Sequence, residues 1–194
     1  MQNHFYAMMS RMKNIYRWGL MRNTKNENLS EHSLETAQIA HALAIINNKR
    51  LGGTADPADC ALAAMFHDTT EIITGDMPTP VKYFNAEIKD AYKQIEENAK
   101  QRLTRMLPED FREDFEKIYN PGKETERLVK AADKISALIK CTEKLNMGNR
   151  EFAEAEKTIR AAIAELSCPE ADIFLKEFMP SFSLSLDETA GGEV

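Results

Sequence analysis

Apolar residues recur along this chain with the three- and four-residue spacing of amphipathic helices. The clearest run follows Ser30, a preferred N-cap residue. From there helical spacing continues to about residue 48, through Leu34, Ala37, Ile39, Ala40, Leu43 and Ile46. No stretch alternates apolar and polar residues as a half-buried strand does. The pattern therefore predicts an all-α fold, an irregular single-domain helical bundle.

Capping residues, prolines and glycines predict where the other helices begin and end. Asp56-Pro57 combines a capping side chain with proline at the first helical position, and the helix it opens is expected to reach about residue 73. The segment TGDMPTP that follows is expected to form a loop, because its glycine and two prolines disfavour helix. Further helices are expected over 4–15, 85–106, 108–119, 123–147, 150–166 and 169–179, with Gly148 as a C-cap and Pro180 as a stop.

Composition agrees with a helical globular protein. The 194 residues are 43% hydrophobic and 29% charged, which is typical of a globular chain rather than a disordered one. Helix-breaking residues are few, with 8 glycines and 7 prolines. This length fits one domain, predicted over residues 1–188, and the terminal TAGGEV predicts a disordered tail over 189–194.

Charge narrows the range of partners. Acidic residues outnumber basic residues by 31 to 25, which gives a net charge of −6. A protein that holds nucleic acid by its phosphates needs a basic face, so nucleic acid is not expected as a partner. A small anionic ligand needs only a few local cations, and the composition is compatible with one.

The cysteines and the apolar runs predict a cytoplasmic protein. Cys60, Cys141 and Cys168 lie far apart and form no C-x-x-C pair, as expected of single buried thiols in a reducing compartment. The N-terminal residues lack the basic and apolar regions of a signal peptide. The longest uncharged run, 36–48, is too short to cross a bilayer, so no membrane partner is expected.

The segment MFHDTTEIITGD carries the most suggestive chemistry. If the predicted helix continues through it, one face presents His67, Asp68 and Glu71 beside Cys60 and Ala64. Carboxylates on a core-facing stripe are costly unless they are paired or bind a metal ion. The spacing alone is equally compatible with a solvated helix end that carries incidental charges.

Two further residues extend this candidate site. His32 shares a helix face with Ile39 and Leu43 and is expected to point toward the core, while Asp133 lies in an apolar part of a late helix, in LVKAADKISALIK. Taken singly, each is compatible with a structural role, as a buried histidine or a salt-bridged aspartate. Together with His67-Asp68 they form the pattern H…HD…D. His41 is half a turn away from His32 on the same predicted helix and is expected to be structural.

With these residues the sequence resembles the HD-domain metal-dependent phosphohydrolases, and among them the bacterial 5′-deoxynucleotidases. The resemblance rests, in order along the chain, on IYRWGLMRNTKNENLSEHSL, HDTTEIITGDMPTPVKYFN, KAADKISALIKCTEKLNMGN and FMPSFSLSLDE. It implies a bundle of the HD-domain type and a single divalent metal ion held by His32, His67, Asp68 and Asp133. Co²⁺ or Mn²⁺ is favoured, and Fe²⁺ or Zn²⁺ also suits two imidazoles and two carboxylates.

The resemblance also implies roles for the neighbouring residues. Glu71 is similar to the family's catalytic acid, and a carboxylate there can orient or deprotonate the attacking water or protonate the leaving 5′-oxygen. The alternative is a carboxylate that only orients His67. Arg17 is expected to bind the phosphate and act in catalysis, the alternative being a solvated arginine. Trp18 is expected in the nucleotide pocket, where its indole excludes a 2′-hydroxyl, the alternative being a core residue. The other expected substrate contacts are His32, Asp68, Asp76, Met77, Pro78 and Thr79, with Lys82 as a possible extra cation.

The predicted function is hydrolysis of deoxyribonucleoside 5′-monophosphates to deoxynucleosides and phosphate by a metal-activated water. Three alternatives remain: a guanosine tetraphosphate hydrolase, a nucleoside triphosphate hydrolase and a metal-bound nucleotide sensor without turnover. Ile72 argues against the first, which carries a second acid after the HDxxE glutamate, and the acidic chain argues against the second. A homodimer is expected because FYAMMSRMKNIYRWGLM offers more apolar surface than one thin helix can bury, and because the family forms dimers.

Overall fold

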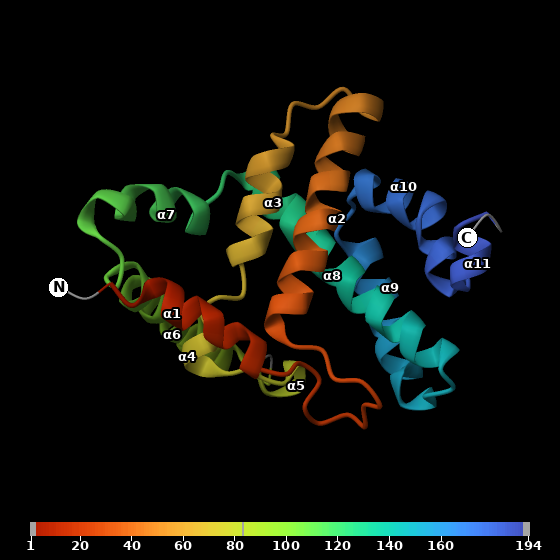
Figure 1. Ribbon diagram of the computed structural model, residues 1–194, viewed down its shortest axis with the longest axis horizontal. Coiled ribbons are helices and arrows are strands. Elements are labelled where there is room, and N and C mark those ends of the chain that lie inside the picture. The colour runs from red at the N-terminus through yellow and green to blue at the C-terminus, as the bar shows by residue number, and fades with distance from the viewer. Residues whose placement is uncertain (1–2, 83, 192–194) are drawn as a thin grey trace. The chain divides into compact units, whose positions relative to one another are not determined.

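The helical prediction is confirmed in a computed structural model that describes residues 3–82 and 84–191. Within those ranges every regular element is a helix, and the only β-type pairing is an isolated antiparallel bridge between Tyr16 and Asn28 (Figure 1). None of the described helices combines the length and the hydrophobicity that crossing a membrane requires.

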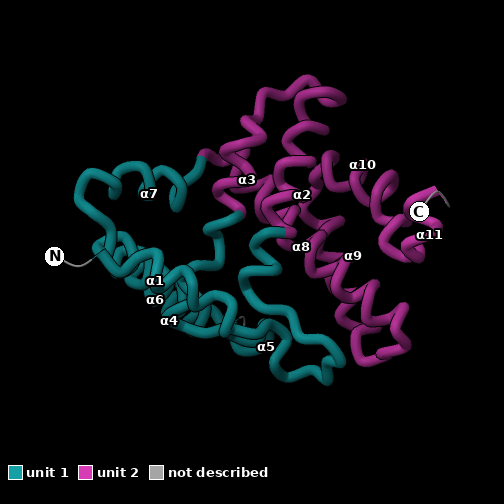
Figure 2. Tube along the Cα trace, viewed as in Figure 1, with its two compact units in different colours: residues 1–34, 65–121 teal, residues 35–64, 122–194 magenta. Residues whose placement is uncertain are grey.

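The chain's internal contacts divide it into two compact units, shown in different colours in Figure 2. Unit 1 contains residues 1–34 and 65–121, and unit 2 contains residues 35–64 and 122–194. The single domain over 1–188 stays a prediction. In the segment predicted as a tail, Thr189 ends a short helix and Gly191 lies in a turn, while residues 192–194 are outside the described residues.

Unit 1 is built around a small aromatic core. Phe5 is fully buried, and its ring centroid lies 4.6 Å from that of Phe115. The Phe66 ring packs against the same Phe115 ring at 5.3 Å, and Leu103 and Leu107 complete the cluster. The elements of this unit are α1 (Phe5–Met9), the 3₁₀ helix η1 (Ser10–Asn14), α4 (Glu71–Thr74), α5 (Thr79–Lys82), α6 (Ala86–Thr104), η2 (Glu109–Phe111) and α7 (Arg112–Tyr119).

Unit 2 contains the larger aliphatic core. Leu43, Leu128, Ile135 and Leu138 are all fully buried in it. Two helices, α2 (Leu29–Arg50) and α3 (Pro57–Phe66), contribute most of their residues to this unit and their remaining residues to unit 1. The other elements of unit 2 are α8 (Lys123–Asn146), η3 (Arg150–Phe152), α9 (Ala153–Glu165), α10 (Pro169–Glu177), η4 (Met179–Ser183) and α11 (Leu186–Thr189).

The buried carboxylate of Glu170 links three helices of unit 2. Arg127 of α8 donates two hydrogen bonds to the Glu170 carboxylate of α10, at 2.7 and 2.8 Å. The Asn47 amide of α2 donates a third at 2.7 Å. The Arg127 guanidinium and these hydrogen bonds lower the pKa of Glu170 to about 2, so this carboxylate is charged throughout the neutral range.

The predicted start of α2 was wrong by two residues. The Asn28 side-chain oxygen accepts hydrogen bonds from the amides of Ser30 and Glu31, at 3.0 and 3.1 Å. The Glu31 carboxylate accepts one in return from the Asn28 amide at 2.9 Å. This reciprocal arrangement pairs the amides of the first helical turn and the amide of Asn28 itself, whereas a cap at Ser30 would not pair both. Helix α2 therefore begins at Leu29.

Other predicted helix starts have the expected capping residues. Two prolines that were expected to disfavour or end helical structure instead lie within helices. Asp56 accepts hydrogen bonds from the amides at the start of α3, and Asn85 caps α6 by accepting from the Ile88 amide at 2.8 Å. Pro80 lies in the first turn of α5, inside the segment expected to be loop, where proline's missing N–H costs nothing. Pro180 likewise lies in the first turn of η4 instead of ending helical structure.

Candidate active site

The helix expected to run from residue 57 to 73 breaks in two, and the break carries His67 and Asp68. Helix α3 ends at Phe66 and α4 begins at Glu71, so the continuous face predicted through these residues was wrong. The Thr69 hydroxyl donates to the Phe66 carbonyl at 2.9 Å, which satisfies a carbonyl at the helix end. The same hydroxyl lies 3.1 Å from the Tyr119 hydroxyl of α7, which anchors the turn to the core of unit 1.

Three of the four predicted metal ligands come together at this turn. The Asp68 Oδ2 atom lies 3.2 Å from His67 Nε2 and 3.5 Å from His32 Nε2. One ligand atom from each residue lies within 4.8 Å of the others, and no other such group of three occurs among the described residues. Two imidazole nitrogens and a carboxylate oxygen form a donor set that suits a divalent transition metal. Asp133 is half-buried on α8, in unit 2, and its place in the ligand set stays a prediction.

The segment between η1 and α2 is a closed loop that brings Arg17 and Glu27 together. The Arg17 amide donates to the Glu27 carbonyl and the Leu29 amide to the Ile15 carbonyl, each at 3.0 Å. Between these two bonds, Arg17 Nη1 donates to Glu27 Oε1 at 3.0 Å. The loop therefore holds Arg17 by both its backbone and its side chain.

Glu27 also faces His32, which makes it a site residue that sequence reasoning missed. The Glu27 Oε1 atom lies 3.6 Å from His32 Nδ1, on the opposite side of the ring from Asp68. His32 is 1% exposed, which confirms that it points into the core, and Glu27 is 8% exposed. The only sequence signal was an acid directly before the Asn28 cap, one of 31 acidic residues in the chain. The contacts thus run from Arg17 through Glu27 and His32 to Asp68 and His67.

Trp18 has a strained backbone that is held from two sides. Its φ angle is 62°, in the left-handed region that residues with a Cβ rarely adopt. The Trp18 amide donates to the Asp76 carboxylate at 3.1 Å, and the Asn23 side chain donates to the Trp18 carbonyl at 3.2 Å. Asp76 therefore contacts Trp18 as well as being a predicted substrate contact.

Glu71 lies in an electrostatic environment that favours its protonated form. Burial, together with the negative charges of Asp68 and Asp76, raises the pKa of Glu71 to about 9, while Arg17 and Lys82 partly oppose the shift. A carboxyl group with this pKa holds its proton at neutral pH and can donate it.

The remaining predicted contacts lie on the segment after α4 and on α5 itself. Met77 and Pro78 are half-buried, and Thr79 is exposed at the start of α5. Lys82, the possible extra cation, pairs with Glu96 at 2.8 Å and lies over the Tyr92 ring at 4.7 Å. His41 is exposed on α2, and the three cysteines are buried free thiols, as expected.

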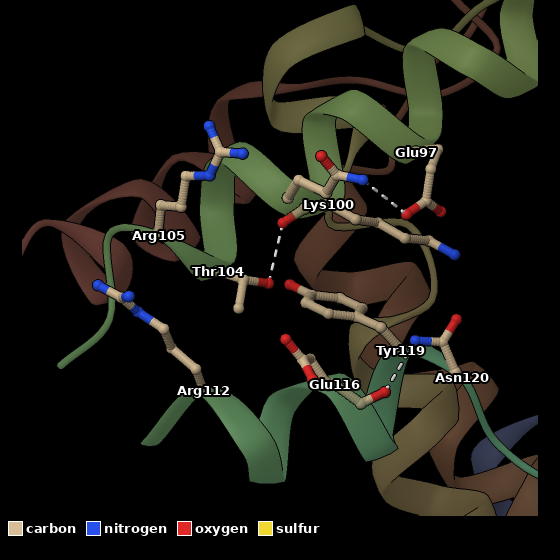
Figure 3. A pocket seen from close by; sticks show the side chains of 9 residues that line it. Glu97, Lys100, Thr104, Arg105, Arg112, Glu116, Tyr119 and Asn120 are labelled. Atoms are coloured by element: carbon tan, nitrogen blue, oxygen red, sulfur yellow. Dashed lines mark hydrogen bonds between the residues drawn. The ribbon is translucent and has the colours of Figure 1, made fainter. Parts of the chain in front are cut away.

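A separate pocket of about 430 Å³ lies in unit 1 between α6 and α7 (Figure 3). None of the predicted site residues lines it. Tyr119 is nevertheless common to the pocket and to the contact with Thr69. The lining residues are Glu97, Lys100, Gln101, Thr104, Arg105, Arg112, Glu116, Tyr119 and Asn120.

Comparison with known proteins gives one consistent family. A family described as 5′-deoxynucleotidase YfbR-like matches residues 4–182. The chain is 50% identical to a 5′-deoxynucleotidase of Vibrio atlanticus over 190 residues, which cover 96% of this chain and 98% of the relative. It is 51% identical to the Vibrio cholerae 5′-deoxynucleotidase with the same coverage.

Solved structures show the same fold. An HD-domain phosphohydrolase from Listeria innocua superposes with a TM-score of 0.81 at 24% identity, covering 94% of this chain and 90% of that one. A cyanophage S-2L HD phosphohydrolase, DatZ, bound to dA and one catalytic Zn²⁺ ion, gives a TM-score of 0.69 at 18% identity, covering 93% of this chain and 99% of the other. Both confirm a helical bundle of the HD-domain type.

Proposed function

Because the chain belongs to the 5′-deoxynucleotidase YfbR-like family, its reaction is the hydrolysis of a deoxyribonucleoside 5′-monophosphate, and we propose which residues carry out each part of it. One observation carries the assignment. A cation suited to phosphate, Arg17, is joined through Glu27 to a metal-binding group of His32, His67 and Asp68.

His32, His67 and Asp68 would hold the metal ion, with Asp133 as the fourth ligand that the family resemblance implies. When bound, a divalent cation supplies Lewis-acid chemistry: it polarises a phosphoryl oxygen and makes water a better nucleophile at neutral pH. Co²⁺ or Mn²⁺ is the proposed ion. The single catalytic Zn²⁺ ion of the cyanophage protein supports one metal ion per site.

Arg17 binds the phosphate. Its guanidinium presents N–H donors in a planar fork whose geometry matches two phosphoryl oxygens, and Glu27 accepts one hydrogen bond from its Nη1. The ion pair and the backbone bond to Glu27 hold this side chain in one place, which limits the conformational entropy lost when substrate binds.

Glu71 donates a proton to the leaving group. As the water oxygen forms its bond to phosphorus, the bond from phosphorus to the 5′-oxygen breaks and that oxygen takes the Glu71 proton. One proton of the water stays on the product phosphate, and the other passes to the Glu71 carboxylate and restores the acid. The raised pKa supports this role, because Glu71 is protonated at the start of the reaction. Donation by a positioned acid avoids the release of a high-energy alkoxide.

Trp18 and the segment from Asp76 to Thr79 contact the nucleoside. Fixed phosphate binding by Arg17 puts the sugar at a set distance from the adjacent indole, which leaves no room for a 2′-oxygen. Asp76 can accept a hydrogen bond from the 3′-hydroxyl, and Met77, Pro78 and Thr79 complete the pocket. The dA bound to the cyanophage protein supports a deoxynucleoside in this fold.

We also propose a cytoplasmic location and a homodimer. A deoxynucleoside monophosphate is an intracellular metabolite, and the cysteines are buried as free thiols. Several apolar side chains of unit 1 are exposed, among them Tyr6, Tyr16 and Leu20, and burying them against a second copy would be favourable.

Phosphate release from a nucleotide panel tests the function. The purified protein, with added Co²⁺ or Mn²⁺, should release phosphate from deoxyribonucleoside 5′-monophosphates in preference to ribonucleotides, triphosphates and guanosine tetraphosphate. His67→Ala serves as the matched inactive control. Binding of deoxynucleotide without phosphate release would instead indicate a sensor, and preference for another nucleotide would indicate one of the other hydrolases.

A further inference from the structure

Glu27 is a nearly buried carboxylate that contacts two functional side chains while belonging neither to the predicted metal ligands nor to the predicted substrate contacts. It is 8% exposed, and its Oε1 atom lies 3.0 Å from Arg17 Nη1 and 3.6 Å from His32 Nδ1. A buried charge is costly unless it is paired, so these contacts account for its burial.

We propose that Glu27 is a positioning residue that sets the metal-binding geometry of His32 and the phosphate-binding geometry of Arg17 at the same time. The inference rests on the proposed function, since it assigns the two neighbours to metal and phosphate. It adds that one carboxylate, Glu27, couples the metal-binding part of the site at His32 to the phosphate-binding part at Arg17.

The position of Glu27 determines which His32 nitrogen is available to a metal ion. His32 Nδ1 faces Glu27, whereas Nε2 lies 3.5 Å from Asp68 Oδ2 on the metal side. A carboxylate beside Nδ1 favours the tautomer with its proton on Nδ1, which leaves the Nε2 lone pair free to coordinate. The His32 side chain is 0% exposed, so bulk water is not available to replace Glu27 in this role.

The same carboxylate fixes the direction of the Arg17 guanidinium. The Arg17 amide bonds to the Glu27 carbonyl at 3.0 Å, and the Arg17 Nη1 atom bonds to the Glu27 carboxylate at the same distance. The first bond uses only backbone atoms and therefore survives any change of the Glu27 side chain. Substitution of Glu27 thus removes its side-chain contacts with the guanidinium and with His32 Nδ1 while leaving this closure of the loop in place.

Metal titration tests the His32 half of the proposal. We would measure the apparent Kd for Mn²⁺ of the metal-stripped wild type, Glu27→Gln, Glu27→Ala and a control, Glu87→Gln. Glu87 is an exposed residue at the start of α6, so the control makes the same charge change away from the site. Metal binding by Glu27→Ala should weaken about 10–100-fold. Glu27→Gln should lose less, because its amide oxygen keeps an acceptor beside Nδ1 although the negative charge is lost.

Steady-state kinetics test the Arg17 half. For the metal-saturated protein acting on dAMP, Glu27→Gln should raise KM more than it lowers kcat, because phosphate binding loses its orientation. In an Arg17→Ala background, Glu27→Gln should have no further effect on KM, whereas its effect on the Kd for Mn²⁺ should persist. A residue that only stabilised the fold would lower the melting temperature and leave both quantities unchanged.

The proposal is overturned if the Kd for Mn²⁺ of Glu27→Gln and Glu27→Ala stays within about twofold of the Glu87→Gln value. Glu27→Gln preserves side-chain shape and carries the comparison if Glu27→Ala does not fold. An additive KM effect in the Arg17→Ala background would likewise overturn the coupling. Metal titration needs no turnover, so a wild type that binds Mn²⁺ but hydrolyses no deoxynucleotide would contradict the proposed function and leave the His32 comparison valid.

Discussion

At the scale of single residues, Trp18 combines a strained backbone with a large, rigid side chain. A left-handed φ of 62° costs energy for any residue with a Cβ, and the bonds to Asp76 and Asn23 hold Trp18 there. Strain maintained in this way fits a role in which the direction of the indole matters more than its burial.

Replacing Trp18 with alanine should relax the discrimination between sugars. An unpaired buried 2′-hydroxyl costs about 1–3 kcal/mol, so the dAMP to AMP ratio of kcat/KM should fall by roughly fivefold to 150-fold. Alanine keeps a Cβ, so the backbone strain is not changed. The control variant is Arg17→Ala, which should lower kcat/KM for dAMP and for AMP by the same factor. An unchanged ratio in Trp18→Ala would transfer the discrimination to the segment from Asp76 to Thr79.

A second prediction for a single residue concerns Glu71 and the dependence of the reaction rate on pH. A general acid must be protonated to act, so kcat/KM should fall as the pH rises through the Glu71 pKa, which lies near 9. In Glu71→Gln the alkaline fall assigned to this group should vanish, and kcat should drop about 10²–10⁴-fold. Metal binding should be retained. Loss of metal from this variant would show that Glu71 is a ligand and that the assignment is wrong.

At the scale of the elements, the Arg127–Glu170 pair holds α8 to α10 in unit 2. Breaking a fully buried pair costs roughly 3–5 kcal/mol. The Arg127 side chain is 35% exposed, so Glu170→Gln should lower the free energy of unfolding by less, about 2–3 kcal/mol. Urea denaturation measures this change in the free energy of unfolding. Glu165→Gln, at an exposed position of α9, is the control and should change it by less than about 0.5 kcal/mol.

The same pair gives unit 2 a defined sensitivity to acid. The folded-state pKa of Glu170, about 2, lies below its ordinary value of 4.5, so the folded state binds fewer protons than the unfolded state between these values. The contribution of the ionised Glu170 to the free energy of unfolding is complete above about pH 4.5 and is lost as the pH falls toward 2. The stability difference between wild type and Glu170→Gln should therefore shrink over that interval. A constant difference from pH 5 to pH 2 would contradict the ion-pair explanation.

The elements also show what sequence reasoning can and cannot predict. Caps such as Asp56 and Asn85 were identified because each uses a side chain and amides two or three residues away. The break after Phe66 was missed, because hydrophobic spacing continues through it and the contact of Thr69 with Tyr119 joins residues 50 positions apart. His32, His67 and Asp68 could be named from their motif. Glu27 could not, because its role depends on the closure of a loop in three dimensions.

At the scale of the whole molecule, the exposed apolar residues of unit 1 predict a homodimer. Light scattering at micromolar concentration should give about twice the 22.0 kDa mass of the chain. Leu20 is 79% exposed, and Leu20→Asp should weaken association if this surface is the interface. Gln94→Asp, at an exposed position of α6, is a control for the added charge. A wild type that scatters as a 22 kDa particle would contradict the prediction.

Metal binding should stabilise the whole folded chain, because the unfolded chain does not hold His32, His67 and Asp68 together. At a metal concentration 100-fold above Kd, the stabilisation is about 2.7 kcal/mol, so chelation should lower the melting temperature by several degrees and abolish phosphate release. His67→Ala should show neither the metal-dependent rise in melting temperature nor activity. Asp133→Ala tests the ligand that only the family resemblance implies: if Asp133 coordinates the metal, the metal-dependent rise above the variant's own metal-free melting temperature should shrink. A full metal-dependent rise in Asp133→Ala would remove this residue from the ligand set, and full activity of the wild type in exhaustively chelated buffer would contradict a metal-dependent reaction.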